Sequence, residues 1–258
     1  MTAFLPGSRK KKRIMMRAYN RFATVYDELT DNVEYKKRTD YIHRFFKLYN
    51  IAAGSSVIDL ACGTGSFSAL LAEKGYDVTG IDSSDDMLTV AASKCGGNVK
   101  LLKADMRSFQ LEKQCDACIC CLDSINHLEN IDDVKQTFRC INDSLFKSGL
   151  FIFDMNTLYK HKQILADSTF VFDKEDYFLS WDNEYAGNGK INIFLDLFIR
   201  NGNMYKRYSE EFSETAYRLQ TIKAALKPFF EIEGIYDDLS LKKPERTSER
   251  LYFICRSI

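Results

Sequence analysis

The sequence predicts an α/β fold built on a doubly wound, mixed sheet of seven strands. Between residues 57 and 154, short apolar runs alternate with segments of helical spacing, which is typical of parallel strands joined by helices. A glycine-rich turn follows the first apolar run and marks the sheet edge where such folds bind ligands. After residue 158 this alternation stops, and aromatic-rich runs separated by turn signals predict an inserted antiparallel sheet.

The first strand and its loop carry the most specific pattern in the chain. The apolar run 57–60 leads into a turn with glycines at positions 63 and 65, and a helix is predicted over 66–74. Asp59 precedes the loop by four residues, and Ser68 stands where a dinucleotide-binding turn has its third glycine. A carboxylate near the loop suits a ligand with an ammonium and a sulfonium better than a pyrophosphate. An NAD-dependent oxidoreductase is the alternative.

This loop resembles the first motif of the class I S-adenosylmethionine-dependent methyltransferases, D-x-x-C/G-G-x-G, which Asp59, Cys62, Gly63 and Gly65 match. The resemblance implies a Rossmann-like fold with S-adenosylmethionine as the cofactor. It further implies that Gly63 and Gly65 line the methionine part of the cofactor and that Asp59 helps to hold its amino group. A chance loop is the alternative interpretation.

Acids at the ends of the next two strands fit the rest of this cofactor. Asp82 ends the apolar run 78–81, where a carboxylate can accept hydrogen bonds from two ribose hydroxyls, although it could instead cap a helix. Asp105 follows the run 99–103, and similar methyltransferases place such an acid against the adenine amino group, with the next residue, Met106, in apolar contact. A turn role is the alternative for Asp105. The expected site also includes the flanking residues Ala61, Ser83, Met87, Ala104, Leu122 and Asp123.

The loop at 123–128, after the apolar run 115–122, is the candidate catalytic segment. Ligands of open α/β sheets bind outside the carboxyl ends of the strands, so this loop should face the transferred methyl group. Methyl transfer from a sulfonium is an in-line displacement, and it needs a base only if the acceptor arrives protonated. His127, with Asn126 beside it, is the candidate for that base.

The loop also resembles the Ser-x-x-His-Leu segment of the amino-sugar N-methyltransferases, in which that histidine is the proposed base. A structural hydrogen bond is the alternative role for His127. The N/D-P-P-Y/F/W motif of enzymes that methylate DNA bases or glutamine amides is missing from this position. Asp123 and Asn126 imitate part of a metal-dependent O-methyltransferase site, but no second acidic pair completes it, so we expect no metal.

The segment before the sheet is expected to form helices that fold over the cofactor. Residues 1–18 form a basic tail that we predict to be disordered. Methyltransferases with a similar F-A-x-x-Y-D segment shield the sulfonium with aromatic residues, which implies this role for Phe22, Tyr26 and Tyr35. Plain core packing is the alternative. Arg38, one helical turn after Tyr35, is a candidate partner for the methionine carboxylate.

We expect the inserted sheet to occupy residues 159–215 and to act as a lid on the acceptor site. Its turn signals are Gly-Asn-Gly at 187–189 and Asn-Gly-Asn at 201–203. After it, a helix at 217–227 and two antiparallel strands at 230–236 and 250–255 should complete the methyltransferase domain, which comprises 19–158 and 216–258. The candidate acceptor contacts are aromatic and basic, namely Trp181, Tyr185, Tyr208, Arg200 and Arg207. A dimer surface is the alternative role for these aromatics.

Composition limits the partners and the compartment. The 36 basic and 36 acidic residues balance, so no overall charge favours nucleic acid. No apolar run is long enough to span a membrane or to act as a signal peptide, which predicts a cytoplasmic protein, either a monomer or a homodimer. Half of the eight cysteines fall in one apolar strand without a second pair at metal spacing, so we expect reduced thiols.

Together these observations predict an S-adenosylmethionine-dependent methyltransferase that acts on a nitrogen or oxygen of a small molecule. An amine acceptor is favoured only by His127. The alternatives are an RNA- or protein-modifying methyltransferase and a cofactor-binding protein without catalytic activity.

Overall fold

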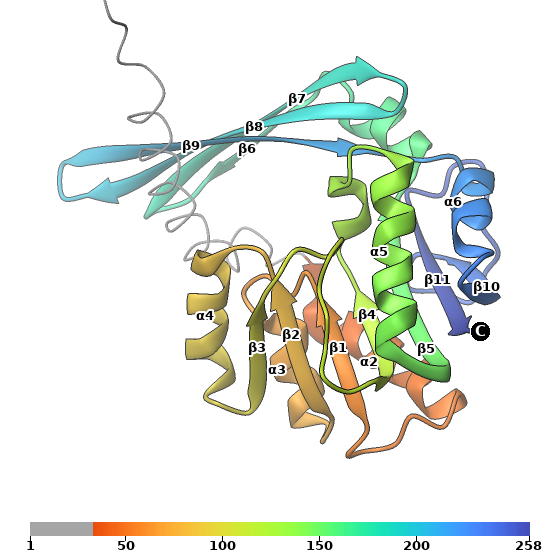
Figure 1. The fold of residues 1–258 in the computed structure, drawn as a ribbon. Helices are drawn as coiled ribbons and strands as arrows, with labels where there is room; N and C mark the ends of the chain where they lie inside the picture. Colours follow the sequence, from red (N-terminus) through yellow and green to blue (C-terminus); the bar gives the residue numbers. More distant parts are fainter. Residues whose placement is uncertain (1–32) are drawn as a thin grey trace, which may run out of the picture.

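The computed structural model describes residues 33–258, so the expected basic tail and the candidate residues Phe22 and Tyr26 lie outside the described part. Two sheets make up the frame of the molecule (Figure 1). The first part of the chain contains α2 (Tyr35–Leu48), β1 (Ser56–Leu60), α3 (Ser66–Glu73), β2 (Asp77–Asp82), α4 (Asp85–Cys95), β3 (Val99–Lys103) and β4 (Cys115–Cys120). The second part contains the 3-10 turn η2 (Ser124–His127), α5 (Ile131–Ser144), β5 (Leu145–Asn156), the π-helical turn η3 (Lys160–Leu165), β6 (Thr169–Asp173), β7 (Tyr177–Gly187), β8 (Lys190–Asn201), β9 (Met204–Thr215), α6 (Leu219–Leu226), β10 (Phe230–Asp237) and β11 (Arg250–Ser257).

The larger sheet has seven strands in the order β10-β11-β5-β4-β1-β2-β3. The strands from β5 to β3 are parallel, whereas β11 runs antiparallel to both β5 and β10. This arrangement confirms the predicted mixed, doubly wound sheet. The chain leaves β1 and β4, which are neighbours, toward opposite sides of the sheet. A crevice therefore opens between their carboxyl ends, where such folds bind ligands.

Alternation along the strands divides the core between the two faces of the sheet. On β4, Cys118 and Cys120 belong to the apolar cluster that also contains Phe138 of α5, whereas Ala117 and Ile119 belong to the cluster on the opposite face. All eight cysteines are buried as free thiols. Burial raises the pKa of the Cys118 and Cys120 thiols well above the ordinary value, so they act as small apolar side chains.

The second sheet has four antiparallel strands in the order β6-β7-β8-β9, which confirms the predicted insertion after β5. It lies above the carboxyl edge of the larger sheet (Figure 1). Strands β7 to β9 have 11 or 12 residues each, and they continue through polar residues that alternate with more buried ones. The π-helical turn that leads into this sheet is not foreseen by the sequence analysis. No helix within residues 33–258 is long and apolar enough to cross a membrane.

Candidate functional site

Two adjoining cavities lie at the carboxyl edge of the larger sheet. The larger has a volume of about 990 Å³ and reaches beneath the four-stranded sheet, where Trp181 and Phe212 line it. The smaller has a volume of about 450 Å³ and lies beside the ends of β2 and β3. Both volumes are typical of small-molecule sites. The residues that line both cavities, and thus mark their junction, are Ala61, Asp82, Ser83, Met106 and His127.

The loop after β1 is held in shape by Asp82. One carboxylate oxygen of Asp82 accepts a hydrogen bond from the amide of Gly63 at 2.9 Å, and the other accepts one from the amide of Ser84 at 2.8 Å. Ala61 and Gly63 have φ angles of 57° and 53°, a left-handed conformation that is costly for alanine and is found at ligand sites. A carboxylate has about four acceptor positions, so Asp82 retains capacity for a ligand's hydroxyl groups.

Asp59 reaches the larger cavity from the strand itself and is almost completely buried, with 2% exposed surface. The hydroxyl of Ser68 donates a hydrogen bond of 2.5 Å to it. Burial raises the pKa of Asp59 to about 7, and the nearby Asp82 adds to the rise, while the Ser68 hydrogen bond opposes it. Ser68, which stands where a dinucleotide-binding turn has its third glycine, therefore donates a hydrogen bond to Asp59. A cation in the cavity would give the Asp59 carboxyl group a charged partner.

Gly65, unlike Gly63, does not line either cavity. A Cβ at this position would lie 2.9 Å from the Cβ of Ala91 on α4, and φ is 77°. The glycine is thus required for the packing of α3 against α4, and its contact with the cofactor stays a prediction. Gly63 does line the larger cavity, and a Cβ there would meet no atom within 4 Å.

Replacing each of these two glycines by alanine should therefore affect stability and cofactor binding to different degrees. Gly65→Ala should lower the free energy of unfolding by about 1–3 kcal/mol, because it adds both backbone strain and a clash. Gly63→Ala, the matched control, should cost only the strain, about 1–2 kcal/mol, but should weaken cofactor binding more than Gly65→Ala. Urea unfolding and titration calorimetry with S-adenosylmethionine measure the two effects. Equal losses of stability in both variants would contradict the packing role.

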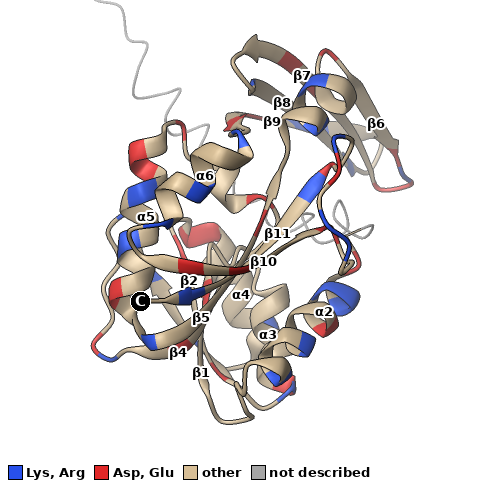
Figure 2. Ribbon diagram, turned by 90° about the vertical axis from the view of Figure 1, so that its right-hand side faces the viewer, with Lys and Arg blue, Asp and Glu red and all other residues tan. Residues whose placement is uncertain are grey.

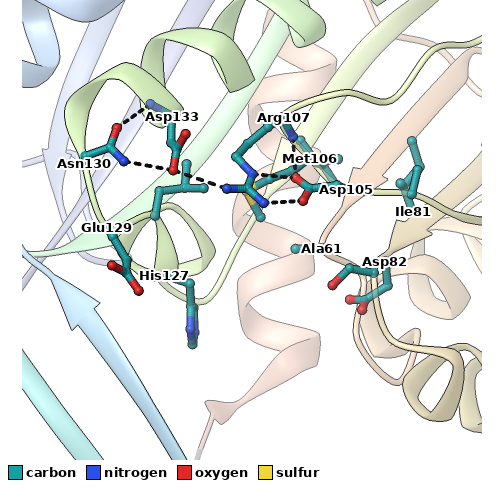
Figure 3. Close-up of a pocket in the computed structure, with 14 residues that line it drawn as sticks. Ala61, Ile81, Asp82, Asp105, Met106, Arg107, His127, Glu129, Asn130 and Asp133 are labelled. Carbon is teal, nitrogen blue, oxygen red and sulfur yellow. Dashed lines mark hydrogen bonds and ion pairs between the residues drawn. The ribbon is translucent and has the colours of Figure 1, made fainter.

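The smaller cavity is bordered by a charged network at the end of β3 (Figure 3). Arg107 donates to both oxygens of Asp105, at 2.9 and 2.5 Å, and reaches Asp133 of α5 at 3.3 Å. The hydrogen bonds from Arg107 lower the pKa of Asp105. Ala104 and Met106 line the same cavity. The structure thus brings Ala104, Asp105 and Met106 together at the smaller cavity. It also places Arg107 there, and both oxygens of the Asp105 carboxylate accept hydrogen bonds from this arginine.

The loop after β4 is fixed by a buried carboxylate from β5. Asp154 accepts hydrogen bonds from the amides of Leu122 and Asp123, at 2.8 and 2.9 Å, and forms an ion pair with Arg250 of β11. Leu122 and Asp123 both have positive φ angles, 55° and 52°, and both line the larger cavity. Arg250 also binds Asp123 at 2.7 Å. Although burial opposes it, Arg250 and Lys160 lower the pKa of Asp123 to about 2.

Asn126 is not exposed to the site, which corrects its expected catalytic role. Its side chain is fully buried and donates to the carbonyl oxygens of Asn156 and Thr215, at 3.2 and 3.0 Å. It also accepts a hydrogen bond of 2.9 Å from the amide of Asn156. Asn126 therefore links η2 to the ends of β5 and β9 through its buried side chain. Its position in the sequence does not indicate the direction in which this side chain points.

His127, the next residue, points the other way and lines both cavities. Its ring lies 5.3 Å from the ring of Phe212 at an interplanar angle of 31°, and its side chain is 45% exposed. Its Nε2 atom is 4.0 Å from the carboxylate of Glu214 on β9. The imidazole is thus both accessible and held by the four-stranded sheet.

The remaining expected residues divide between the cavity and its surroundings. Tyr35, Arg38 and Met87 line the larger cavity. Arg38 is already engaged, because its guanidinium donates to Asp238 at 2.9 Å and to the hydroxyl of Tyr252 at 3.0 Å. Of the residues expected from the inserted sheet, Trp181 lines the larger of these two cavities, whereas the following four line neither of the two: Tyr185, Tyr208, Arg200 and Arg207. Arg207 instead pairs with Asp196 at the surface.

Several residues without a predicted role reach the cavity from distant parts of the chain. Lys160, Glu214 and Arg250 line it from η3, β9 and the start of β11. Because β11 is antiparallel to β5, its first residue lies at the carboxyl edge, opposite Asn156. The signal for Glu214 was the alternation Glu210, Phe212, Glu214, which places all three side chains on one face of β9.

The site fits S-adenosylmethionine by the chemistry of its donors and acceptors. In the part of the chain that the structure describes, the buried Asp59 has no cation on its carboxyl group and lines the larger cavity together with Gly63, which suits an ammonium group. Asp82 retains acceptor positions at the junction, which suit a ribose diol. The smaller cavity combines the apolar side chains of Leu60, Ile81 and Met106 with an acid, which suits adenine.

Comparison with known proteins agrees with this geometry. A family model described as a methyltransferase domain matches residues 57–149. The protein YqeM of Bacillus subtilis strain 168, whose name assigns it provisionally to the methyltransferases, is 34% identical over 241 residues, which cover 91% of this chain and 95% of that protein.

Solved structures show the same relationship. An S-adenosylmethionine-dependent methyltransferase from Clostridium acetobutylicum ATCC 824 is 32% identical with a TM-score of 0.84, over 92% of this chain and 98% of that one. The sugar N-methyltransferase KedS8 from Streptoalloteichus sp ATCC 53650 shares the fold, with 20% identity and a TM-score of 0.73 over 89% of this chain and 92% of that one. With more than 30% identity over most of its length, the chain belongs to the class I S-adenosylmethionine-dependent methyltransferases, and S-adenosylmethionine is its cofactor.

Proposed function

We propose that this methyltransferase acts on the nitrogen of a small amine that binds between the four-stranded sheet and the loop at 123–128. The observation that carries the proposal is the charge of the larger cavity. Among residues 33–258, nine acidic side chains line it, against three basic ones, Arg38, Lys160 and Arg250. Such a cavity attracts a cation, and an amine is protonated near neutral pH.

The aromatic part of the cavity supports a small acceptor. Phe172, Trp181 and Phe212 line it from the inner face of the four-stranded sheet, so an acceptor there would be enclosed between two sheets. A polynucleotide would require a continuous basic surface. Figure 2 instead shows basic and acidic segments interspersed along the helices and loops on its side of the molecule.

Bound S-adenosylmethionine would supply a methyl group on a sulfonium. We propose that Asp59 binds its ammonium, Asp82 its ribose, and Asp105 with Met106 its adenine. The remaining residues of the proposed cofactor site are Tyr35, Arg38, Ala61, Cys62, Gly63, Ser83, Met87, Ala104, Leu122 and Asp123, and Tyr26 stays a prediction outside the described residues. His127 would take a proton from the acceptor nitrogen, and the fixed loop at 122–123 would hold the acceptor in line.

The proposal is tested by incubating the protein with methyl-labelled cofactor and separate fractions of cell metabolites, RNA and protein. Label should enter the metabolite fraction and, within it, cationic compounds retained on a cation exchanger. Label in RNA or in protein would reject the small-molecule acceptor. Label in neutral or acidic metabolites would reject the amine.

His127→Gln should lower kcat/KM for the amine by about 10²–10⁴, because the acceptor must then lose its proton without a base. The affinity for S-adenosylmethionine should stay within about threefold of that of the unchanged protein, since the loop itself is fixed by Asp154. His43→Gln is the matched control, because His43 lies outside both cavities and bonds Tyr76. Initial rates across pH 6 to 9 provide the measurement, and full activity of His127→Gln across this range would remove the base assignment.

The compartment that we propose is the cytoplasm. Eight free thiols are buried without a disulfide among them, which fits a reducing environment.

A further inference from the structure

Lys160 is the one cavity-lining lysine or arginine that forms no ion pair within the described part of the chain. The other two, Arg38 and Arg250, already pair with carboxylates. Lys160 belongs to η3, and its ammonium group donates a hydrogen bond of 3.0 Å to the amide oxygen of Asn156. An ammonium group carries three hydrogens, so Lys160 retains capacity for an anionic ligand.

The surroundings of Lys160 leave its charge incompletely balanced. Burial lowers the pKa of its ammonium group, and the positive charge of Arg250 lowers it further, whereas the carboxylates of Asp123 and Glu214 oppose the change. Asp123 does not serve Lys160 alone, because it pairs with Arg250 at 2.7 Å. An anion bound in the cavity would therefore stabilise the charged lysine.

Glu214, on β9, brings the opposite charge to the same cavity. Its side chain lines the cavity and is only 7% exposed, so it is largely removed from water. The two histidines beside it, His161 at 3.5 Å and His127 at 4.0 Å, form no hydrogen bond with it. No lysine or arginine among residues 33–258 forms an ion pair with it. A nearly buried carboxylate without such a partner attracts an ammonium group.

The side-chain amide of Asn156 holds these two charges beside each other. Its oxygen accepts the hydrogen bond from Lys160, and its nitrogen donates to Glu214 at 3.4 Å and to Asp123 at 2.9 Å. One planar amide group thus separates an ammonium group from a carboxylate, and both of these groups line the cavity. The ammonium and the carboxylate of an α-amino acid are likewise separated by one carbon atom, so such a molecule can present the complementary charge to each.

We propose that the acceptor is an α-amino acid, bound with its carboxylate at Lys160 and its amino group at Glu214. This rests on the proposed amine methylation and names the class of amine. An amine without a carboxylate would leave Lys160 without an anion, and a carboxylic acid without an amine would leave Glu214 without a cation.

The reaction converts the primary amine of the amino acid to a secondary amine. His127 takes one proton from the acceptor's ammonium group. The freed nitrogen lone pair then forms a bond to the methyl carbon while the bond between that carbon and the cofactor's sulfur breaks. The nitrogen thereby regains a positive charge, and Glu214 pairs with the product as it does with the substrate.

Lys160→Met should lower kcat/KM for α-amino acids by about 10- to 100-fold, because it removes the charge but keeps a chain of similar length. The amines that the same amino acids give by loss of the carboxyl group should be poorer substrates of the unchanged protein, and Lys160→Met should not lower their rates further. Lys162→Met is the matched control, because Lys162 is an exposed lysine of the same turn that lines neither cavity. Initial rates with methyl-labelled S-adenosylmethionine and paired amino acids and amines provide the measurement.

Three results would each overturn the α-amino acid as the acceptor. The unchanged protein could methylate the amines as well as the amino acids, or Lys160→Met could weaken both classes equally. Lys160→Met could also weaken the binding of S-adenosylmethionine itself, which would mean that Lys160 holds the carboxylate of the cofactor. Calorimetric titration with S-adenosylmethionine detects the third result, and urea unfolding shows whether the variant is folded. The comparison within the unchanged protein does not depend on any variant.

Binding separates this proposal from the proposed function. The protein is loaded with S-adenosylhomocysteine, which has no methyl group to transfer, and saturation-transfer NMR detects bound amino acids. If amino acids bind to the unchanged protein but not to Lys160→Met, and no nitrogen is methylated, the α-amino acid site stands and amine methylation fails. If amines are methylated while amino acids neither bind nor react, the reverse holds. An α-amino acid is a cation in acid, where its carboxyl group is protonated, so an acidified cation exchanger retains it with the other amines.

Discussion

Replacement of Asp154 by alanine is expected to lower the free energy of unfolding by about 3–5 kcal/mol and to abolish methyl transfer. Asp154 is completely buried, pairs with Arg250, and accepts the amide hydrogens of Leu122 and Asp123. Its removal would leave a buried guanidinium with one carboxylate in place of two and would leave two amide donors without their acceptor. The left-handed backbone of the loop would lose the contacts that enforce it.

Urea unfolding and initial rates measure the two effects of Asp154→Ala. Asp77→Ala is the control, because Asp77 also forms an ion pair, with Lys100 at 3.0 Å, but both side chains are more than half exposed. Such surface pairs contribute about 0–1 kcal/mol. A loss of less than 1 kcal/mol in Asp154→Ala would show that the loop holds its conformation without this carboxylate.

The burial of each strand determines how well it could be predicted from the sequence. Strands β1 and β4 and the second half of β5 could be located because they are buried on both faces and thus appear as continuous apolar runs. The turns of the four-stranded sheet could be located from Gly-Asn-Gly and Asn-Gly-Asn, but the full extent of β7, β8 and β9 could not, because one face of this sheet is partly exposed and carries Glu, Ser and Arg. Polar residues there resemble a loop unless a partner strand is known.

The site shows the same division. Asp82, Asp105 and His127 could be located because each follows a strand, and the carboxyl ends of parallel strands converge on one edge. Direction was harder to predict than position, as Asn126 and His127 show by pointing to opposite sides of one turn. The alternation along β9 could assign Glu214 to a face of its strand, but neither Glu214 nor Arg250 could be assigned to the site, since only the pairing of distant strands brings them to this edge.

Asp59 is the opposite case to Asp154, although both are buried acids at the carboxyl edge. Asp154 has a guanidinium partner, whereas Asp59, among residues 33–258, is hydrogen-bonded to Ser68 and has no cationic partner, and burial raises its pKa to about 7. Between pH 3.8 and about 7 the carboxyl group of Asp59 is therefore protonated in the folded protein but ionised in the unfolded chain, where its pKa is near 3.8. Because the folded state binds more protons between these two values, its stability must fall as pH rises from about 4 to about 7.

Asp59→Asn should remove this dependence. Three pKa units correspond to about 4 kcal/mol, so above pH 7 the variant should be more stable than the unchanged protein by up to that amount. The cofactor ammonium would reverse the balance, because it favours the charged form of Asp59. The affinity of the unchanged protein for S-adenosylmethionine should thus increase as pH rises from 6 to 8, and Asp59→Asn should bind at least about tenfold more weakly at pH 8.

Urea unfolding at pH 4.5 to 8.5 and calorimetric titration with the cofactor at pH 6 to 8 test both halves of this prediction. The difference between variant and unchanged protein isolates Asp59 from other titrating groups, and Asp77→Asn should show no such difference, since that side chain is exposed. If Asp59→Asn is less stable than the unchanged protein at pH 8, then Asp59 is ionised and well solvated in the fold. If it is more stable but binds the cofactor equally well, the carboxylate does not contact the ammonium. Gain of stability together with loss of affinity would mean that this acid is kept for ligand binding at the expense of folding.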